Sequence, residues 1–384
     1  MKNDDELDKY FDMLDPENRK RVIAFNNFMV DHPHFTHGFE QAMSAINSAG
    51  GSRVVIVTGP TGAGKTTLAR KIYKTLRKQY SKLIASDPGC IPVVGLNAVS
   101  PNGIAFSWKD FFVRLLQQAG DVLMKRKLLI PRQYELFEGM SAPLPIEQST
   151  ADVLRRAVEK CLKNRKIRVL IIDEAHHILM VNDPKRLEFQ FEALKSLSIE
   201  SNVVIVLVGT YRLLAIRDQS GQLVRRSEIV HFPRYNLTQK ADGKSFVGAL
   251  KQLQDVIPLP VKPNLVRAAR YFFLKSGGSI GILKDWLLRC VIHAILRGEK
   301  TFDADFAEEF ALSNKSLITI LQEAIQGELA LEDVSIDEVK ELLYRVASKP
   351  TTEPAQAGAG DKPKRKVGTR NPVRDKTGVD HVTR

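Results

Sequence analysis

A glycine-rich segment carries the residues with the clearest chemical meaning in this sequence. It reads GPTGAGKTT and fits the pattern GxxxxGK[ST]. Glycines let the backbone approach closely and adopt positive φ, so N–H groups at a helix N-terminus can surround a phosphate. Lys65 would bring a cation to the β and γ phosphates, and the Thr66 hydroxyl would bind Mg²⁺. The sequence therefore predicts an ATP and Mg²⁺ site whose loop consists of Gly59, Pro60, Thr61, Gly62, Ala63, Gly64, Lys65, Thr66 and Thr67.

Two adjacent carboxylates follow another apolar run, VLIIDEAHH, at 169–177. Asp173 fits the second protein partner of the magnesium ion, beside Thr66. Glu174 fits a base that orients or deprotonates the attacking water. Adjacent carboxylates without a cation would be costly, so the pair supports a metal-dependent ATPase.

The letters after Asp173 suggest two other readings, a helicase and a histidine metal site. No second RecA-like repeat is present, and about 170 mostly helical residues follow the strand at 203–208, too few for a second such domain. Neighbouring histidines point different ways on a helix, and His176 and His177 have no Cys or His companion at ligand spacing. Packing or surface roles are therefore expected for both histidines.

Two further segments contain candidate catalytic residues. The apolar run 203–208 ends in Gly209-Thr210, which places Thr210 as a polar sensor of the γ-phosphate; a simple strand-ending turn is the alternative. Arg225 and Arg226 precede a short apolar strand at 228–232 and could act as an arginine finger on a neighbouring subunit. Such a finger is worth about 10³ to 10⁵ in rate. A solvated or DNA-facing arginine pair remains the alternative.

These residues need a scaffold that brings strand ends together. Helical patterns separate short β-branched runs, and this alternation predicts an α/β fold with a parallel sheet sandwiched by helices. Ligands of such sheets bind at the carboxyl ends of the strands. The predicted strands span 53–58, 91–96, 168–172 and 203–208, and the helices between them 107–126, 151–163 and 185–198.

Beyond 237 the pattern is helical, which predicts a smaller helical lid with helices at 238–255, 264–275, 280–297, 303–313 and 315–346. The expected organisation is a helical lead-in at 1–50, an α/β nucleotide-binding domain at 51–236, the lid and C-terminal helices at 237–348, and a disordered basic tail at 349–384.

The charge balance predicts a polyanionic partner. The formal charge is +13 and the pI about 9.5. Nine Lys or Arg and four Asp or Glu lie at 349–384, so the rest of the chain still carries +8. No apolar run approaches the roughly 20 residues of a membrane span, and the N-terminus is acidic, so a cytoplasmic protein without membrane contact is expected.

Taken together, these motifs resemble the TniB/TnsC family of AAA+ transposition regulators over roughly residues 20–300. The most telling segments are QLVRRSEIVHFPRYNL at 222–237 and SGGSIGILKDWLL at 276–288, and the match also rests on GPTGAGKTT, GLNAVSPNG at 95–103, IIDEAHH and VLVGT. The lid segment departs from most AAA+ proteins because it offers no sensor arginine, and Lys284 is its nearest basic residue.

The resemblance implies a P-loop ATPase that assembles as a ring or filament on double-stranded DNA. It would link a TniQ/TnsD-like target selector to a DDE transposase, and ATP hydrolysis would drive disassembly. DNA contacts would come from loops near 97–109, with Lys109 and Arg114 as candidates beside the alternative of ordinary solvated helix charges. Two other functions stay open: an origin-recognition or clamp-loader-like ATPase, and a nucleotide-gated scaffold with little hydrolysis, against which Glu174 argues.

Overall fold

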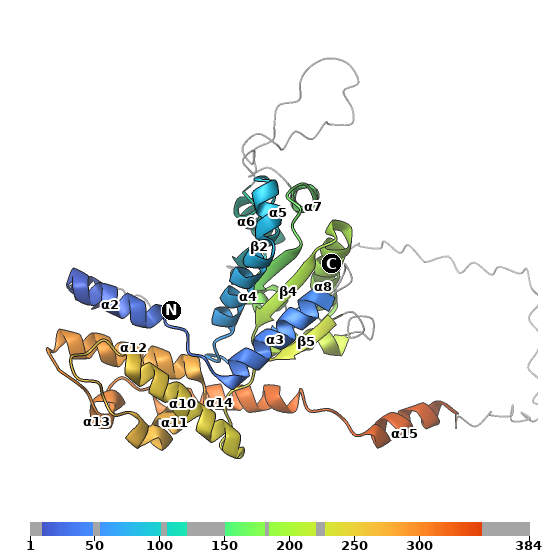
Figure 1. Ribbon diagram of the computed structural model, residues 1–384. Coiled ribbons are helices and arrows are strands. Elements are labelled where there is room, and N and C mark those ends of the chain that lie inside the picture. Colours follow the sequence, from blue (N-terminus) through green and yellow to red (C-terminus); the bar gives the residue numbers. More distant parts are fainter. Residues whose placement is uncertain are drawn as a thin grey trace, which may run out of the picture. The chain divides into compact units, whose positions relative to one another are not determined.

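A computed structural model describes residues 10–48, 54–100, 106–120, 150–180, 184–219 and 227–347 (Figure 1). Contacts divide the chain into two compact units, Met1–Glu332 and Asp333–Arg384. The predicted nucleotide-binding region at 51–236 lies in the first unit, whereas the predicted lid and C-terminal helices at 237–348 are divided between the two units. The predicted disordered tail at 349–384 lies outside the described residues.

Five parallel strands form one sheet in the order β2-β3-β4-β1-β5. Their bounds are β1 Val54–Thr58, β2 Val93–Asn97, β3 Val169–Asp173, β4 Val204–Gly209 and β5 Ser227–His231. Every residue of β1, β3 and β4 is buried, as expected for a parallel sheet covered on both faces. The register places Thr58 beside Gly209 and His231, and Asn97 beside Asp173, so the carboxyl ends of the strands align. The predicted α/β fold is confirmed.

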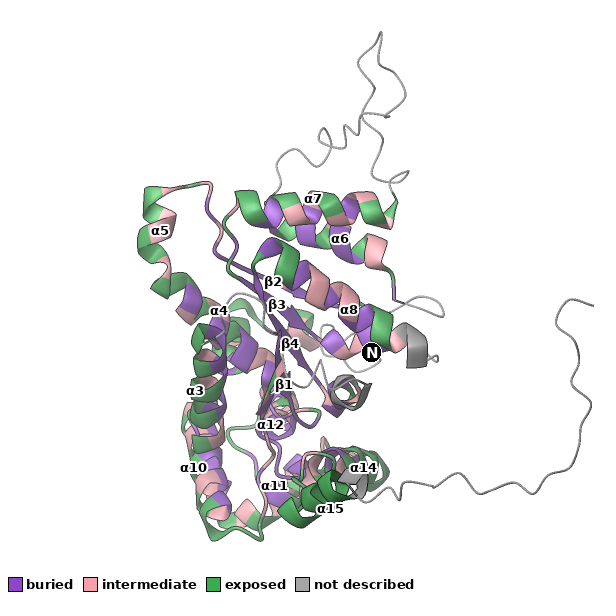
Figure 2. Ribbon diagram, turned by 90° about the vertical axis from the view of Figure 1, so that its right-hand side faces the viewer, coloured by how far each residue is buried: buried purple, intermediate pink, exposed green. Residues whose placement is uncertain are grey.

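Helices cover the sheet on two sides (Figure 2). Alternate strand residues belong to the cores on the two sides. One side packs Val55 and Val57 against α3 and α4, and the other packs Val54 and Ile56 into a core shared with α6, α7 and α8. The bounds of these helices are α3 Pro33–Ser48, α4 Lys65–Gln79, α6 Trp108–Gln118, α7 Ala151–Asn164 and α8 Pro184–Ser201; the short α5, Ser81–Ser86, follows α4.

A second core lies among the helices after β5 and centres on the buried Trp286. Helix α2, Pro16–Asn27, joins this core through Val22 and Phe25, so the N-terminal lead-in contributes one helix to the lid and one, α3, to the sheet. The remaining elements of this part are α10 Lys240–Val256, the 3₁₀ helix η4 Val266–Ala268, α11 Ala269–Ser276, α12 Ile280–Leu296, α13 Ala304–Glu308 and α14 Asn314–Leu329.

Several predicted helices are too long, and that at 303–313 is only the short α13, Ala304–Glu308. The helix predicted at 107–126 ends at Gln118, and Gly120 follows with φ +62°, a conformation that suits a helix stop. The helix predicted at 315–346 is two helices, α14 and α15 Ile336–Ala347. Ser335 marks the start of the second helix, because its Oγ accepts from the Glu338 N–H at 3.3 Å, as an N-cap side chain does, and donates to the Glu338 carboxylate at 3.2 Å.

Within the described part of the chain, we find no helix with the length and apolarity that crossing a bilayer requires. The cysteines at 90, 161 and 290 are buried and form no disulfide within the described residues.

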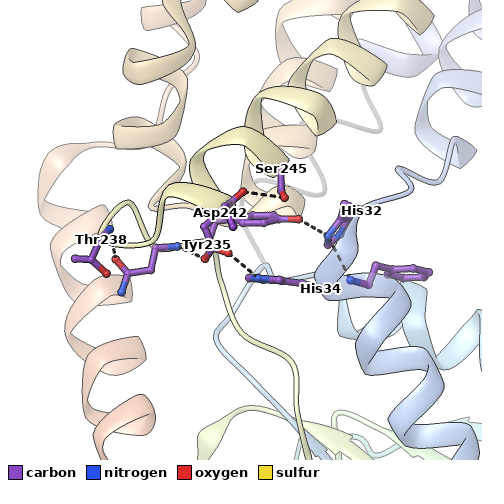
Figure 3. A network of polar contacts seen from close by, with 9 residues as sticks. His32, His34, Tyr235, Thr238, Asp242 and Ser245 are labelled. Carbon is purple, nitrogen blue, oxygen red and sulfur yellow. Dashed lines mark hydrogen bonds and ion pairs between the residues drawn. The ribbon is translucent and has the colours of Figure 1, made fainter.

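A polar network ties the segment between α2 and α3 to the segment between β5 and α10 (Figure 3). The Tyr235 hydroxyl lies 2.8 Å from His32 Nδ1, and the Phe35 N–H donates to the same nitrogen at 3.3 Å. His34 stacks on the Tyr235 ring and contacts Asp242 at 3.0 Å, and that carboxylate accepts the Asn236 N–H. Since His32 Nδ1 accepts a backbone N–H, it carries no proton in this arrangement.

This network predicts a pH-dependent stability. Burial, followed by the effect of His34, lowers the pKa of His32 to about 4 from 6.5. The unfolded chain therefore takes up the proton first, and stability that is fully present above pH 6.5 is lost as the pH falls towards 4. The loss from this group should approach about 3 kcal/mol. Urea unfolding at pH 7 and at pH 4.5 should show a smaller pH effect in His32→Gln than in the wild type.

His37→Gln serves as the control, because His37 is an exposed histidine on α3. Its pH effect should match that of the wild type. An equal pH effect in His32→Gln and the wild type would contradict the assignment to His32.

Candidate functional site

The glycine-rich loop joins β1 to α4, and its geometry fits an anion. Gly64 is the N-cap of α4 with φ +101°, and no side chain caps the helix. The first-turn N–H groups of a helix need partners from outside the helix, and a phosphate oxygen is a suitable one. Residues 59–66, the loop and the start of α4, thus have a geometry that suits a phosphate, and we call them the phosphate cradle.

Lys65 is buried within this cradle, with a residue exposure of 9%. Its Nζ donates to the carbonyl oxygens of Pro60 at 2.8 Å and Gly59 at 3.1 Å. Burial lowers the pKa of Lys65 to about 8, and Glu174, Asp173 and Glu323 oppose that shift. A phosphate would supply the missing counter-charge to this ammonium group.

Thr66 and Asp173 line one pocket, of about 250 Å³, between α4 and the ends of β2 and β3. Asp173 is buried, and its Oδ1 accepts the Glu174 N–H at 2.9 Å. A hydroxyl and a carboxylate facing one pocket beside a phosphate cradle are the oxygen donors that Mg²⁺ prefers. The residues present thus fit the predicted magnesium ion, which Thr66 and Asp173 would hold.

Glu174 begins the turn after β3 in a left-handed conformation, with φ +53°. Its side chain is 46% exposed, in contrast to buried Asp173, so water can reach the carboxylate. At the end of the neighbouring strand β4, the Thr210 Oγ1 is buried and forms no hydrogen bond within the described protein. Both side chains keep polar atoms available near the cradle, as their predicted roles require, although those roles remain predictions.

The two histidines after Glu174 lie together. The prediction that they point different ways is wrong, because the two rings lie against each other; they belong to a 3₁₀ helix, η2 Ala175–Leu179. Their ring centroids are 4.3 Å apart, and His176 Nδ1 lies 3.3 Å from a Glu174 carboxylate oxygen. Burial, followed by the nearby His177, lowers the pKa of His176 to about 4, which keeps this imidazole neutral at pH 7.

Residues 48–216 match the family model of the AAA domain. The match takes in the cradle, Asp173, Glu174 and Thr210, and ends before β5 and the lid helices. A search of curated proteins finds no match.

Three solved structures illustrate what the chain is similar to. The Aeropyrum pernix ORC2 protein in its ADPNP-ADP complexes is 15% identical, with 75% of this chain and 71% of that chain covered and a TM-score of 0.48. The Aeropyrum pernix ORC1 protein in complex with DNA is 16% identical, with 82% of this chain and 82% of that chain covered and a TM-score of 0.46. The Thermotoga maritima RuvB Holliday junction branch migration motor is 16% identical, with 73% of this chain and 68% of that chain covered and a TM-score of 0.38.

The remaining residues that the sequence singled out are arginines and lysines. Arg225 and Arg226 lie outside the described residues. Arg114 is on α6 and pairs with Asp110 at 2.7 Å, and Lys109, on the same helix, also has an interaction partner. Lys284 of α12 donates to the Asn26 and Phe28 carbonyls at 2.6 and 2.8 Å, so its ammonium group holds the end of α2.

The lid also meets the phosphate cradle directly. A Cβ added to Gly281, at the start of α12, would lie 2.2 Å from the carbonyl oxygen of Gly62. A side chain at 281 would therefore force the two backbones apart.

Helix α14 contributes residues that the sequence reasoning missed. It packs on the 3₁₀ helix η3, Tyr211–Gln219, with Gly327 so close to the Tyr211 ring that an added Cβ would overlap it. Arg234 forms two hydrogen bonds to Glu328, at 2.8 and 3.0 Å. One turn earlier on the helix, Glu323 lies 3.8 Å from Arg212. Contacts between residues so far apart in sequence leave no local signal.

Glu323 should weaken nucleotide binding, because its carboxylate lies close enough to Lys65 to raise the pKa of that ammonium group. The same charge would repel a triphosphate. Since Arg212 and Glu323 are about half exposed, we expect screening to limit the effect to about 1 kcal/mol. Glu323→Gln should therefore bind ATP about fivefold more tightly in calorimetry.

Glu309→Gln is the matched control, because Glu309 is paired with Arg297 on an exposed surface. It should leave ATP affinity unchanged. Weaker binding by Glu323→Gln would show that the carboxylate helps to hold the nucleotide.

Proposed function

We propose that this protein binds ATP with Mg²⁺ and hydrolyses it. The observation that carries the proposal is the convergence of Lys65, Thr66, Asp173 and Glu174 at the carboxyl edge of the sheet, from two different βα junctions. The AAA-domain match over this segment agrees with it. No other chemistry requires a buried lysine, a hydroxyl and two carboxylates around one helix N-terminus so directly.

The described residues divide the work among binding, orientation and proton transfer. The N–H groups at the start of α4 and the Lys65 ammonium would bind the phosphates, and Thr66 and Asp173 would hold the metal. When bound, the magnesium ion neutralises charge on the phosphate oxygens. Glu174, the more exposed carboxylate, would accept a proton from water or orient it, and the Thr210 hydroxyl would donate to the γ-phosphate or to that water.

The second part of the proposal concerns the macromolecules with which this ATPase acts. We infer that ATP favours a ring or filament of this chain on double-stranded DNA, and that the assembly connects a target selector to a DDE transposase. Two features support this function: the excess of basic residues in the body of the chain, and the TniB/TnsC-like segments at 222–237 and 276–288. In such an assembly Arg225 or Arg226 would complete the site of a neighbouring subunit.

Negative-stain imaging with a nonhydrolysable ATP analogue and duplex DNA tests assembly. Rings or filaments that require both ligands are expected, and isolated monomers at micromolar concentration would count against the proposal. Because contacts with DNA phosphates dominate such binding, the assemblies should dissociate as the salt concentration rises from about 50 to about 200 mM, whatever the DNA sequence.

A variant pair tests the arginine finger. Arg225→Ala and Arg226→Ala should each keep ATP binding, and one of them should lose DNA-stimulated phosphate release by about 10³-fold or more. Full stimulated activity in both variants would assign these arginines to solvent or DNA.

A further inference from the structure

Glu174, His176 and His177 form a cluster whose donor atoms all lie within 4.8 Å of one another. Each residue offers one atom of a kind that binds metals: a carboxylate oxygen and two imidazole nitrogens. Among the residues that the structure describes, these three form the group of potential metal ligands with such spacing. The ATPase chemistry proposed above uses only the glutamate.

The backbone holds the three side chains in place without a ligand. The His177 N–H donates to the Glu174 carbonyl at 3.0 Å and closes the turn. Ala175, Ile178 and Leu179 are buried, so the 3₁₀ helix is fixed to the core while the intervening side chains face the cluster. The backbone that carries the three side chains is thus held in place, as a metal site requires.

One nitrogen in this cluster lacks a satisfactory partner. His176 Nδ1 is buried and makes no hydrogen bond within the described protein, although a Glu174 oxygen lies 3.3 Å away. A buried polar atom without a hydrogen bond is costly. A cation between this nitrogen and the carboxylate would satisfy both groups.

We propose that Glu174, His176 and His177 bind a transition-metal dication, with Zn²⁺ as the best match. Two imidazoles and one carboxylate are a zinc-type donor set that leaves a fourth position for water, whereas Mg²⁺ prefers oxygen ligands. The site is distinct from the one at Thr66 and Asp173. Since the metal would occupy the Glu174 carboxylate, Zn²⁺ should inhibit hydrolysis; this consequence rests on the proposed function, but the binding does not.

The test of binding uses the full chain, without nucleotide, titrated with ZnCl₂ in excess Mg²⁺ and followed by calorimetry. One equivalent should bind. His177→Ala and the isosteric Glu174→Gln should each weaken binding by more than about tenfold, since even outer-shell partners are worth 10 to 100-fold. His37→Ala, an exposed histidine on α3, and Thr66→Ala should leave it unchanged.

Three results would overturn the site: no zinc binding, unchanged binding in His177→Ala, or loss of binding in Thr66→Ala. Cobalt substitution adds a spectroscopic check, because two nitrogens and one oxygen give visible d–d bands without thiolate charge transfer. Thiolate bands would place the metal at a cysteine.

Phosphate release with Mg²⁺ and ATP then tests the consequence. Micromolar Zn²⁺ should inhibit the wild type, and His177→Ala should resist by more than about tenfold in zinc concentration. Equal inhibition of both proteins would contradict a regulatory effect at this site. If the wild type shows no turnover at all, the proposed function fails while the calorimetric result on zinc still stands.

Discussion

Lys65→Met is expected to weaken ATP binding about 100-fold and, at the same time, to stabilise the nucleotide-free protein. The ammonium group is the cation of the cradle, and hydrogen bonds to charged groups are worth about 1.5 to 3 kcal/mol. Loss of nearly 3 kcal/mol corresponds to about a 100-fold loss of affinity. Isothermal calorimetry with Mg²⁺ and ATP measures this effect.

The gain in stability follows from the lowered pKa of Lys65, about 8 in the folded protein and 10.5 in the unfolded chain. Below pH 8 the folded state holds a charge in a buried place, and that cost disappears as the pH rises towards 10.5. Its size is about 3 kcal/mol, from which about 1 kcal/mol is subtracted for the hydrogen bonds to Gly59 and Pro60. Methionine fills a similar volume without the charge.

Urea unfolding at pH 7 should therefore give Lys65→Met an advantage of about 1 to 2 kcal/mol without nucleotide. Saturating ATP should reverse the order, because it stabilises only the wild type. A less stable variant would mean that the lysine supports the loop through its two carbonyl contacts.

The second large effect is expected in Glu174→Gln, which should keep ATP affinity within a few-fold and slow hydrolysis by about 10² to 10⁴-fold. Glutamine preserves the shape of the side chain but cannot accept a proton. Asp173 and Thr66, the predicted ligands of the metal, are untouched, so binding should survive.

Single-turnover phosphate release, with and without duplex DNA, measures this loss. Glu192→Gln on α8, where Glu192 pairs with Lys195, is the control and should behave as the wild type. Equal rates in the wild type and Glu174→Gln would remove the base from the proposal. Absence of turnover in either protein would favour the nucleotide-gated scaffold.

Sequence was sufficient for features that depend on short stretches of chain. Each predicted strand lies within two residues of the observed one, because short runs of apolar, mostly β-branched residues mark the strands in the sequence. The placement of Thr66 beside Asp173 also followed, since the ends of parallel strands meet at one edge.

Features that depend on distant contacts could not be predicted in this way. No local pattern tells that β1 lies between β4 and β5, or that Glu323 reaches Arg212. The contact between the rings of His176 and His177 does not follow from helical geometry, because successive residues of a 3₁₀ turn are about 120° apart around its axis. The sequence shows Lys284 only as the nearest basic residue of a lid without a sensor arginine, and its contacts with the Asn26 and Phe28 carbonyls follow from the structure alone.

The close approach of Gly62 and Gly281 connects the phosphate cradle to the helix that carries Trp286. With no side chain to absorb a displacement at that point, a shift of the loop on binding a phosphate is passed to the first turn of α12. The same helix carries Trp286, one of two tryptophans in the chain, whose indole N–H donates to the Ala307 carbonyl in the lid core. Occupancy of the cradle should therefore change the intrinsic fluorescence of the unlabelled protein.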